Sequence, residues 1–206
     1  MTASEGIHPS AIVHGSARVD PTAIIGPYCV IEEGVEIGAG TRLDAHVVAH
    51  RGVRIGPDCF LMTEVHIAHN SVLGQHVTLA SGVALGGFSV DEDYAFIGGG
   101  AGQHQHVRVG RLAMVGGNVR IIQDVPPFLL AAEFNVAAKG LNLVGLKRAG
   151  LSPEKISALK RAYRLLYRSK LPLKEALARI EKEVATEEAL YLVSFIRQSE
   201  RGICRE

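Results

Sequence analysis

The sequence has little net charge and no long hydrophobic run, and each shortage excludes a class of protein. Its 22 Lys and Arg residues nearly balance its 21 Asp and Glu residues, for a formal net charge of +1. This balance gives no electrostatic reason to expect binding to nucleic acid or to an anionic membrane surface. No apolar stretch reaches the roughly 18 residues of a membrane-spanning helix, and the first residues lack a basic region followed by an apolar core. We therefore expect a soluble, unexported, cytoplasmic protein.

Cysteine is also scarce, with three residues in a chain of 206. Cys29 and Cys59 fall on a regular column of small residues, which predicts that they pack in a core, while Cys204 stands alone near the end. No cysteine pair is placed to form a metal site. The pattern is typical of a reducing compartment.

What the chain does have is an aliphatic residue at every sixth position from Ile7 to Ile121. Only Ala49, Asp91 and Gln103 break this column. A period of six does not fit the 3.6-residue turn of an α-helix. Separate short strands in a sandwich would alternate for a few residues and then stop, whereas this register persists.

A second column lies four residues after the first and holds only small or β-branched residues, from Ala11 to Val125. Glycine often follows the aliphatic residue, where we expect a corner to need a free backbone. Two inward columns at this spacing predict a parallel β-helix, in which three six-residue sides make one coil. A coil is then about 18 residues, and the repeat holds roughly six to seven coils.

The repeat ends at Pro126-Pro127, so we expect a β-helix over residues 1–127 and a bridge with a helical domain over residues 128–206. The segment 128–150 is expected to be a loop-rich bridge. Ser152 and Pro153 are typical of a helix start, and helical periodicity follows them. Two further helices are expected at about 173–184 and 186–198. The Lys and Arg residues of these helices form either a solvated surface or a face for an acidic carrier protein.

Histidines gather between Ala45 and His106. His50 and His104 are 54 residues apart, or three whole coils, and His69 lies between them with an offset of one residue. Because coils rise by about 4.8 Å, these three side chains are expected to form a column along one corner, about 14 Å long. Imidazoles suit proton transfer near neutrality. A zinc site is the alternative, but the expected spread is too long for ligands of one ion, so we expect no metal.

An ordered set of motifs resembles the UDP-N-acetylglucosamine acyltransferases of lipid A synthesis. The set comprises Val65-His66-Ile67-Ala68-His69-Asn70, Ile97-Gly98-Gly99, His104-Gln105, Val115-Gly116-Gly117, Gln123-Asp124-Val125-Pro126-Pro127, Asn142, Gly145-Leu146-Lys147-Arg148 and Tyr167-Arg168-Ser169. The resemblance covers most of the chain. It implies a left-handed β-helix, a homotrimer with sites between subunits, and transfer of a 3-hydroxyacyl chain from acyl carrier protein to the 3-hydroxyl of UDP-N-acetylglucosamine. It implies no cofactor.

The resemblance also implies roles for individual residues. His69 matches the general base, and the backbone N–H of Gly87 matches the oxyanion donor. Substrate-binding positions of the active cleft match His50, His66, His104 and Gln105. The nucleotide side matches Asn142 and Arg148. Gly117 matches the place where a small residue leaves room for a longer acyl chain.

The chain also departs from that family. It lacks several coils and the two projecting loops, Phe88 stands in place of a histidine, and Asn70 follows the base where many relatives have Asp. Val144 and Ala149 replace polar residues near the nucleotide. Two hypotheses therefore stay open. One is an acyltransferase that uses UDP-N-acetylglucosamine or an altered acceptor, and the other is a catalytically silent trimeric scaffold.

Overall fold

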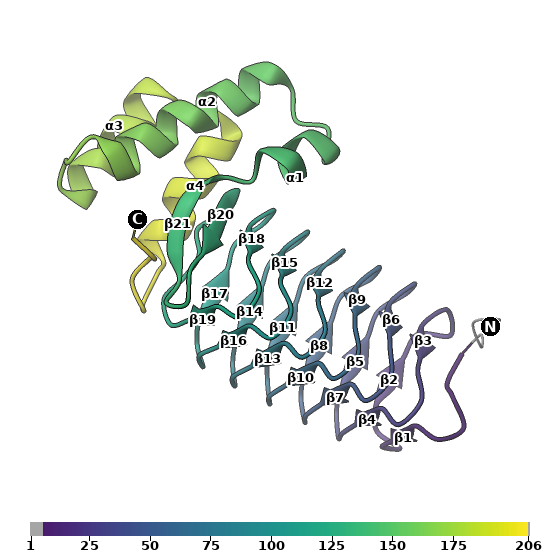
Figure 1. Cartoon of the computed structure of the whole chain (residues 1–206). Coiled ribbons are helices and arrows are strands. Elements are labelled where there is room, and N and C mark those ends of the chain that lie inside the picture. Colours follow the sequence, from purple (N-terminus) through teal and green to yellow (C-terminus); the bar gives the residue numbers. More distant parts are fainter. Residues whose placement is uncertain (1–5, 206) are drawn as a thin grey trace.

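The computed structural model describes residues 6–205 of the chain. Within them, residues 7–125 wind as a left-handed parallel β-helix whose two-residue strands form three parallel sheets (Figure 1). Through residue 103, each strand pairs with the strand 18 residues further on, as His66 pairs with Ala84. The predicted coil is therefore confirmed, because it is the register of the sheets.

The three sheets are named here by the order in which the chain enters them. Sheet 1 contains β1 (Ile12–Val13), β4 (Val30–Ile31), β7 (Val48–Ala49), β10 (His66–Ile67), β13 (Ala84–Leu85), β16 (Gly102–Gln103) and β19 (Arg120–Ile121). Sheet 2 contains β2 (Arg18–Val19), β5 (Glu36–Ile37), β8 (Arg54–Ile55), β11 (Val72–Leu73), β14 (Val90–Asp91) and β17 (Arg108–Val109). Sheet 3 contains β3 (Ile24–Ile25), β6 (Arg42–Leu43), β9 (Phe60–Leu61), β12 (Thr78–Leu79), β15 (Phe96–Ile97), β18 (Met114–Val115), β20 (Leu129–Ala132) and β21 (Ala137–Leu141).

Both sequence columns point into the solenoid. From the second coil onward their members are buried, and the apolar members form one continuous cluster. Cys29 and Cys59 are packing residues, as predicted, and their thiols donate to the backbone carbonyls of Asp44 and Gly74. Cys204 is also buried, because the C-terminal tail folds back onto the last coil.

The glycines that follow the aliphatic column are not the residues that turn the chain at the corners. Every sixth residue from Tyr28 to Asn118 has a positive φ, between 54° and 70°, and most of these residues are not glycine. The glycines that follow the aliphatic column have no positive φ, so the expectation that they supply the corner conformation was wrong. They allow close backbone approach instead, since a Cβ on Gly56 would lie 2.5 Å from the carbonyl oxygen of Gly74.

The bridge after the repeat is more regular than the predicted loop. β20 extends sheet 3 in parallel with β18, β21 returns antiparallel to it, and the helix α1 (Leu143–Arg148) follows. The expectation of a loop-rich segment was wrong because alternating burial along β20 arises from contact with β18, which local sequence does not reveal.

Three longer helical segments follow, as predicted: α2 (Pro153–Tyr163), which continues as the π-helix η1 (Arg164–Arg168), then α3 (Leu173–Glu183) and α4 (Glu187–Arg197). The side chains of Ser152 and Thr186 cap α2 and α4. The helices lie over the C-terminal end of the solenoid (Figure 1), where Leu112 and Phe128 join their apolar cluster. None of the helices in the described part of the chain is long and apolar enough to cross a membrane.

Candidate active site

The centre of the candidate site is His69, at the corner between sheets 1 and 2. Its Nδ1 lies 3.1 Å from Oδ1 of Asn70. An amide oxygen can only accept a hydrogen bond, so Nδ1 carries the proton and Nε2 keeps its lone pair. Because Nε2 has no hydrogen-bond partner among the described residues, it is free to accept a proton from a ligand.

Gly87 lies one coil above His69, directly against its ring. A Cβ at Gly87 would be 2.8 Å from both Cε1 and Nε2 of His69, so any larger residue would displace the imidazole. The Gly87 carbonyl accepts from the His106 amide, while its own N–H donates no hydrogen bond to any described residue. A free backbone donor therefore lies beside the free nitrogen of His69.

His50 and His66 form a second group on the same side of the solenoid. Their ring centroids are 4.7 Å apart, and Nδ1 of His50 lies 3.0 Å from Oε1 of Glu32. The Arg51 backbone N–H, which donates to Glu32, holds the pKa of that carboxyl below its usual range. Burial lowers the pKa of His66, and the neighbouring His50 lowers it further, so both effects favour the neutral imidazole.

His104 occupies the corner position three coils above His50, as the spacing predicts. Its Nδ1 lies 3.2 Å from the carbonyl oxygen of Gln105, and both residues are exposed. A groove of about 440 Å³ on the face of sheet 1 is lined by residues that include His66, His104 and Arg120.

The predicted continuous column of imidazoles is not present in the described residues. His69 makes ring contacts with Phe88 and not with His50 or His104. Phe88 in turn stacks on His106. The three histidines do lie at the same corner of the solenoid, as predicted. However, the one-residue offset of His69 directs its ring toward Phe88. Glu32 and His106 were missed, although the 18-residue spacings to His50 and Phe88 would have indicated both contacts.

Asn142 and Arg148 lie away from His69, on a groove of about 490 Å³ between α1 and the outer face of sheet 3. The groove is largely apolar, and its lining includes Tyr94, Phe96, Leu112, Met114, Val144 and Ala149. The Asn142 side chain is already used within the chain. Its Oδ1 accepts from Gly145 N and its Nδ2 donates to Leu112 O, each at 3.0 Å, so it caps α1 and ties it to the solenoid.

Gly117 lies on a different edge of the triangular solenoid, at the corner between sheets 3 and 1. A Cβ there would lie 3.0 Å from the carbonyl oxygen of Gly99, so the corner is tightly packed. The predicted residues are thus brought together in three separate places within one chain. His50, His66, His69, Gly87, His104 and Gln105 share one side, whereas Gly117 and the pair Asn142 and Arg148 lie on two other edges.

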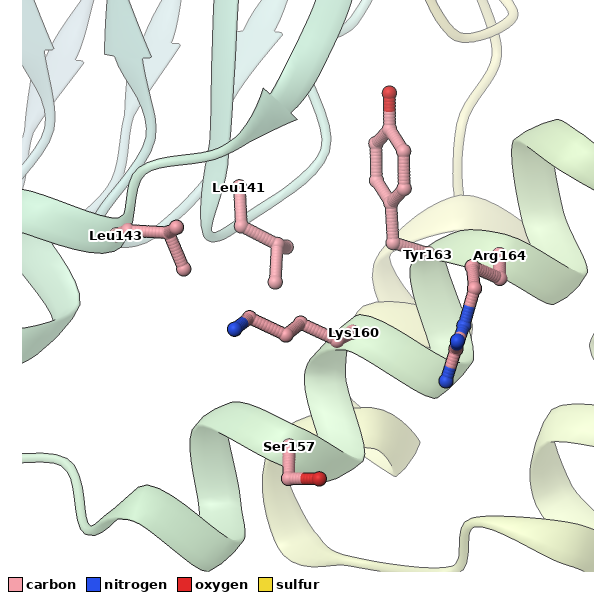
Figure 2. Close-up of a pocket in the computed structure, with 6 residues that line it drawn as sticks. All are labelled: Leu141, Leu143, Ser157, Lys160, Tyr163 and Arg164. Carbon is pink, nitrogen blue, oxygen red and sulfur yellow. The ribbon is translucent and has the colours of Figure 1, made fainter.

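A basic cavity of about 280 Å³ lies where α2 faces the end of β21 (Figure 2). Lys160 extends from α2 toward Leu141 and Leu143, and Arg164 lies one turn further along the helix. Neither cation has an ion-pair partner among the described residues. Residues 147–182, which include α2 and η1, contain eleven Lys and Arg residues and only three Glu residues. This segment is therefore strongly basic, although the whole chain is nearly neutral.

Comparison with family models gives two matches. The model described as UDP N-acetylglucosamine O-acyltransferase, domain 2, matches residues 124–204. The bacterial transferase hexapeptide model, which describes six repeats, matches residues 52–87.

Similar proteins carry consistent names. An acyl-[acyl-carrier-protein]–UDP-N-acetylglucosamine O-acyltransferase of Burkholderia thailandensis is 43% identical over 118 residues, which is 55% of this chain and 45% of that protein. One from Anaeromyxobacter sp. is 42% identical over 123 residues, or 59% of this chain and 48% of that protein. The chain thus spans about half the length of the curated relatives it matches.

Solved structures extend the similarity to the full chain. The UDP-N-acetylglucosamine O-acyltransferase of Moraxella catarrhalis is 30% identical, with a TM-score of 0.68 over 97% of this chain and 99% of that one. The structure from Bacteroides fragilis is 27% identical, with a TM-score of 0.80 over 97% of this chain and 100% of that one.

Proposed function

The chain belongs to the UDP-N-acetylglucosamine O-acyltransferase family, and from this we propose that it moves a 3-hydroxyacyl chain from acyl carrier protein to a hydroxyl of a nucleotide sugar. The acceptor is UDP-N-acetylglucosamine, through its 3-hydroxyl, or a related nucleotide sugar. The observation that carries the proposal is the free Nε2 of His69 held against the free N–H of Gly87.

The chemistry is a direct transfer. Nε2 of His69 takes the proton of the acceptor hydroxyl as its oxygen attacks the carbonyl carbon of the thioester. The Gly87 N–H donates to the oxygen that becomes negative in the tetrahedral intermediate. The carbon–sulfur bond then breaks, and the proton passes from His69 to the departing thiolate. No covalent enzyme intermediate is required.

The remaining site residues have supporting roles in this proposal. His50, His66, His104 and Gln105 line the side of the solenoid that faces the reacting groups. The groove under α1 takes the nucleotide, where Arg148 supplies a cation and Asn142 fixes the position of α1. Gly117 carries no side chain that would limit the length of the acyl chain.

A homotrimer with sites between subunits would bring these residues together. Within one chain His69, Gly117 and Arg148 lie on three different edges of a triangular solenoid. Parallel packing of three solenoids places one edge of each subunit against a different edge of its neighbour. The separation of the residues therefore supports the shared-site arrangement.

The basic surface of α2 and η1 supports an acidic carrier protein as the donor. Lys160 and Arg164, which have no ion-pair partner within residues 6–205, lie beside the apolar side chains of Leu141 and Leu143 (Figure 2). Such a mixture of cations and apolar surface suits an acidic protein helix.

One observation favours the scaffold alternative. The solenoid runs from residue 7 to residue 125 in uninterrupted hexads, without a projecting loop to enclose a sugar. A silent scaffold would trimerise and bind partners without turnover, so it would not need this loop. An enzyme with an altered acceptor would also lack it if that acceptor is bound without a loop around its sugar.

The test is incubation of the protein with 3-hydroxyacyl carrier protein and a panel of nucleotide sugars, with acylated products detected by mass spectrometry. We expect an acylated nucleotide sugar from the wild type. His69→Ala should reduce turnover by about 10²- to 10⁴-fold with little change in donor binding. His46→Ala, a corner histidine stacked on Tyr28 far from the site, is the matched control. A trimeric protein that acylates no acceptor would support the scaffold, and equal turnover in the two variants would refute His69 as the base.

A further inference from the structure

Phe88 is an exposed aromatic residue that lies between two imidazoles. Its φ is +57°, a left-handed conformation that costs an ordinary side chain about 1–2 kcal/mol. It remains 47% exposed, so it adds little to the apolar core. Its ring contacts are with His69, at 5.2 Å between centroids and 89° between planes, and with His106, at 5.1 Å and 4°.

The positions of His106 and His69 along the solenoid indicate which face of the Phe88 ring lies toward His69. His106 lies one coil above Phe88, and its ring is parallel to the phenyl ring. His69 lies one coil below, perpendicular to that ring. By register the two imidazoles lie on opposite sides of Phe88 along the solenoid. Because the phenyl ring is parallel to His106, its other face is turned toward the coil that carries His69, whose ring is perpendicular to it. An aromatic face carries partial negative charge, so an imidazole beside it is favoured when it is positively charged.

Among the described residues, no other group near His69 favours its protonated form. Ion pairs of the described residues that involve histidine join His50 to Glu32 and His76 to Asp58, and neither includes His69. Asn70 offers a neutral oxygen. The charged or titratable neighbours by register are Arg51 one coil below, His66 on β10 and His106 beyond Phe88, and a cation at any of them would oppose a charged His69.

We propose that Phe88 is a positioning residue for His69, which holds the ring perpendicular to its own face and stabilises the imidazolium that forms when Nε2 takes the acceptor proton. This inference rests on the proposed function, in which His69 is the base. At an exposed site such a cation–π contact corresponds to a factor of about 2 to 5 in an equilibrium or rate.

The test uses Phe88→Leu, which removes the π face but keeps an apolar side chain, and Phe88→Tyr, which restores the face. In the full-length protein, turnover by Phe88→Leu should fall about 2- to 5-fold in kcat, with the KM values for donor and acceptor nearly unchanged, and Phe88→Tyr should recover it. Phe88→Leu should have no further effect in a His69→Ala background, because it acts through His69. Tyr28→Leu, which removes an equivalent exposed aromatic residue stacked on His46, is the control and should leave turnover unchanged.

A second measurement needs no substrate. The ring C–H signals of His69, assigned by their loss in His69→Ala, are followed by NMR during a pH titration. The midpoint should move to lower pH by about 0.3–0.7 unit in Phe88→Leu, and should return toward the wild-type value in Phe88→Tyr. An unchanged midpoint in a folded Phe88→Leu protein would overturn the inference even if no acceptor is turned over. If the wild type is inactive but the midpoint moves as expected, the proposed function fails while the contact between Phe88 and His69 stands. An increase in KM instead of a decrease in kcat would make Phe88 a substrate contact and would also overturn it.

Discussion

The Tyr191 hydroxyl donates a 2.5 Å hydrogen bond to Oε2 of Glu92, and so joins α4 to the solenoid. Oε1 of Glu92 accepts from Arg108 at 2.9 Å, and Oε2 also accepts from the Arg111 backbone N–H at 3.0 Å. Burial raises the pKa of Tyr191, and the carboxylate of Glu92 raises it further, so the phenol stays protonated and remains a donor. The helical segment is thus held to the corner between sheets 2 and 3 through one largely buried carboxylate.

Tyr191→Phe should destabilise the protein by about 1.5–3 kcal/mol, because it removes a hydrogen bond to a charged group without leaving a cavity. Urea unfolding followed by circular dichroism measures the loss. Tyr28→Phe, at a 61% exposed position, is the control and should change the free energy of unfolding by less than about 0.5 kcal/mol. Equal stability of the two variants would show that the bond adds nothing to the junction.

Gly87→Ala should lower turnover at least about 10-fold while the protein still folds. The added Cβ would lie 2.8 Å from Nε2 of His69, and no positive φ at Gly87 adds backbone strain. A shift of about 1 Å in a catalytic group is enough for a loss of this size or larger. Gly15→Ala is matched to it, since a Cβ there has no neighbour within 4 Å. Activity in Gly87→Ala equal to that in Gly15→Ala would argue against the placement of the base.

Asp91 is a carboxylic acid buried inside the solenoid, where its two oxygens and Oε1 of Gln103 have no hydrogen-bond partner among the described residues. Burial raises the pKa of Asp91 to about 7, and the Gln103 side chain moderates the rise. An unfolded aspartate titrates at about 3.9, so between about pH 4 and pH 7 the unfolded chain releases a proton that the folded chain keeps. The free energy of unfolding should therefore fall as the pH rises through this window.

Asp91→Asn removes that dependence. Relative to wild type, the variant should gain roughly 3–4 kcal/mol in the free energy of unfolding between pH 4 and pH 8. Thermal unfolding measured across this range is the test, and Glu33→Gln at an exposed corner is the control. A difference from wild type that stays constant with pH would mean that Asp91 is ionised in the folded protein.

Turnover should survive exhaustive dialysis against EDTA. The described residues include no group of three or more His, Cys, Asp or Glu side chains placed to hold a metal ion. The proposed transfer uses His69 and a backbone N–H and needs no Lewis acid. Elemental analysis of the purified protein is the direct check. One zinc per subunit, with activity lost on chelation and restored by zinc, would contradict the mechanism.

The solenoid was predictable because its cause is local and repeated. Each hexad places one aliphatic and one small residue inward, and the 18-residue coil then determines which residues stack. The start of α2 was equally predictable, since Ser152 caps it through a neighbouring backbone N–H. The hairpin of β20 and β21 was not predicted, because it is stabilised by β18, more than a dozen residues earlier in the chain.

For the site, the sequence by itself determined the coil position of each residue, and it brought His50, His69 and His104 to one side of the solenoid. Only the tertiary structure decided what each side chain meets. The left-handed corners aim His69 at Phe88 and Gly87, pair His50 with Glu32, and use the Asn142 amide to cap α1. The physical reason is that periodic burial fixes which residues point inward, whereas outward side chains turn according to the backbone angle at each corner and the neighbours one coil above and below.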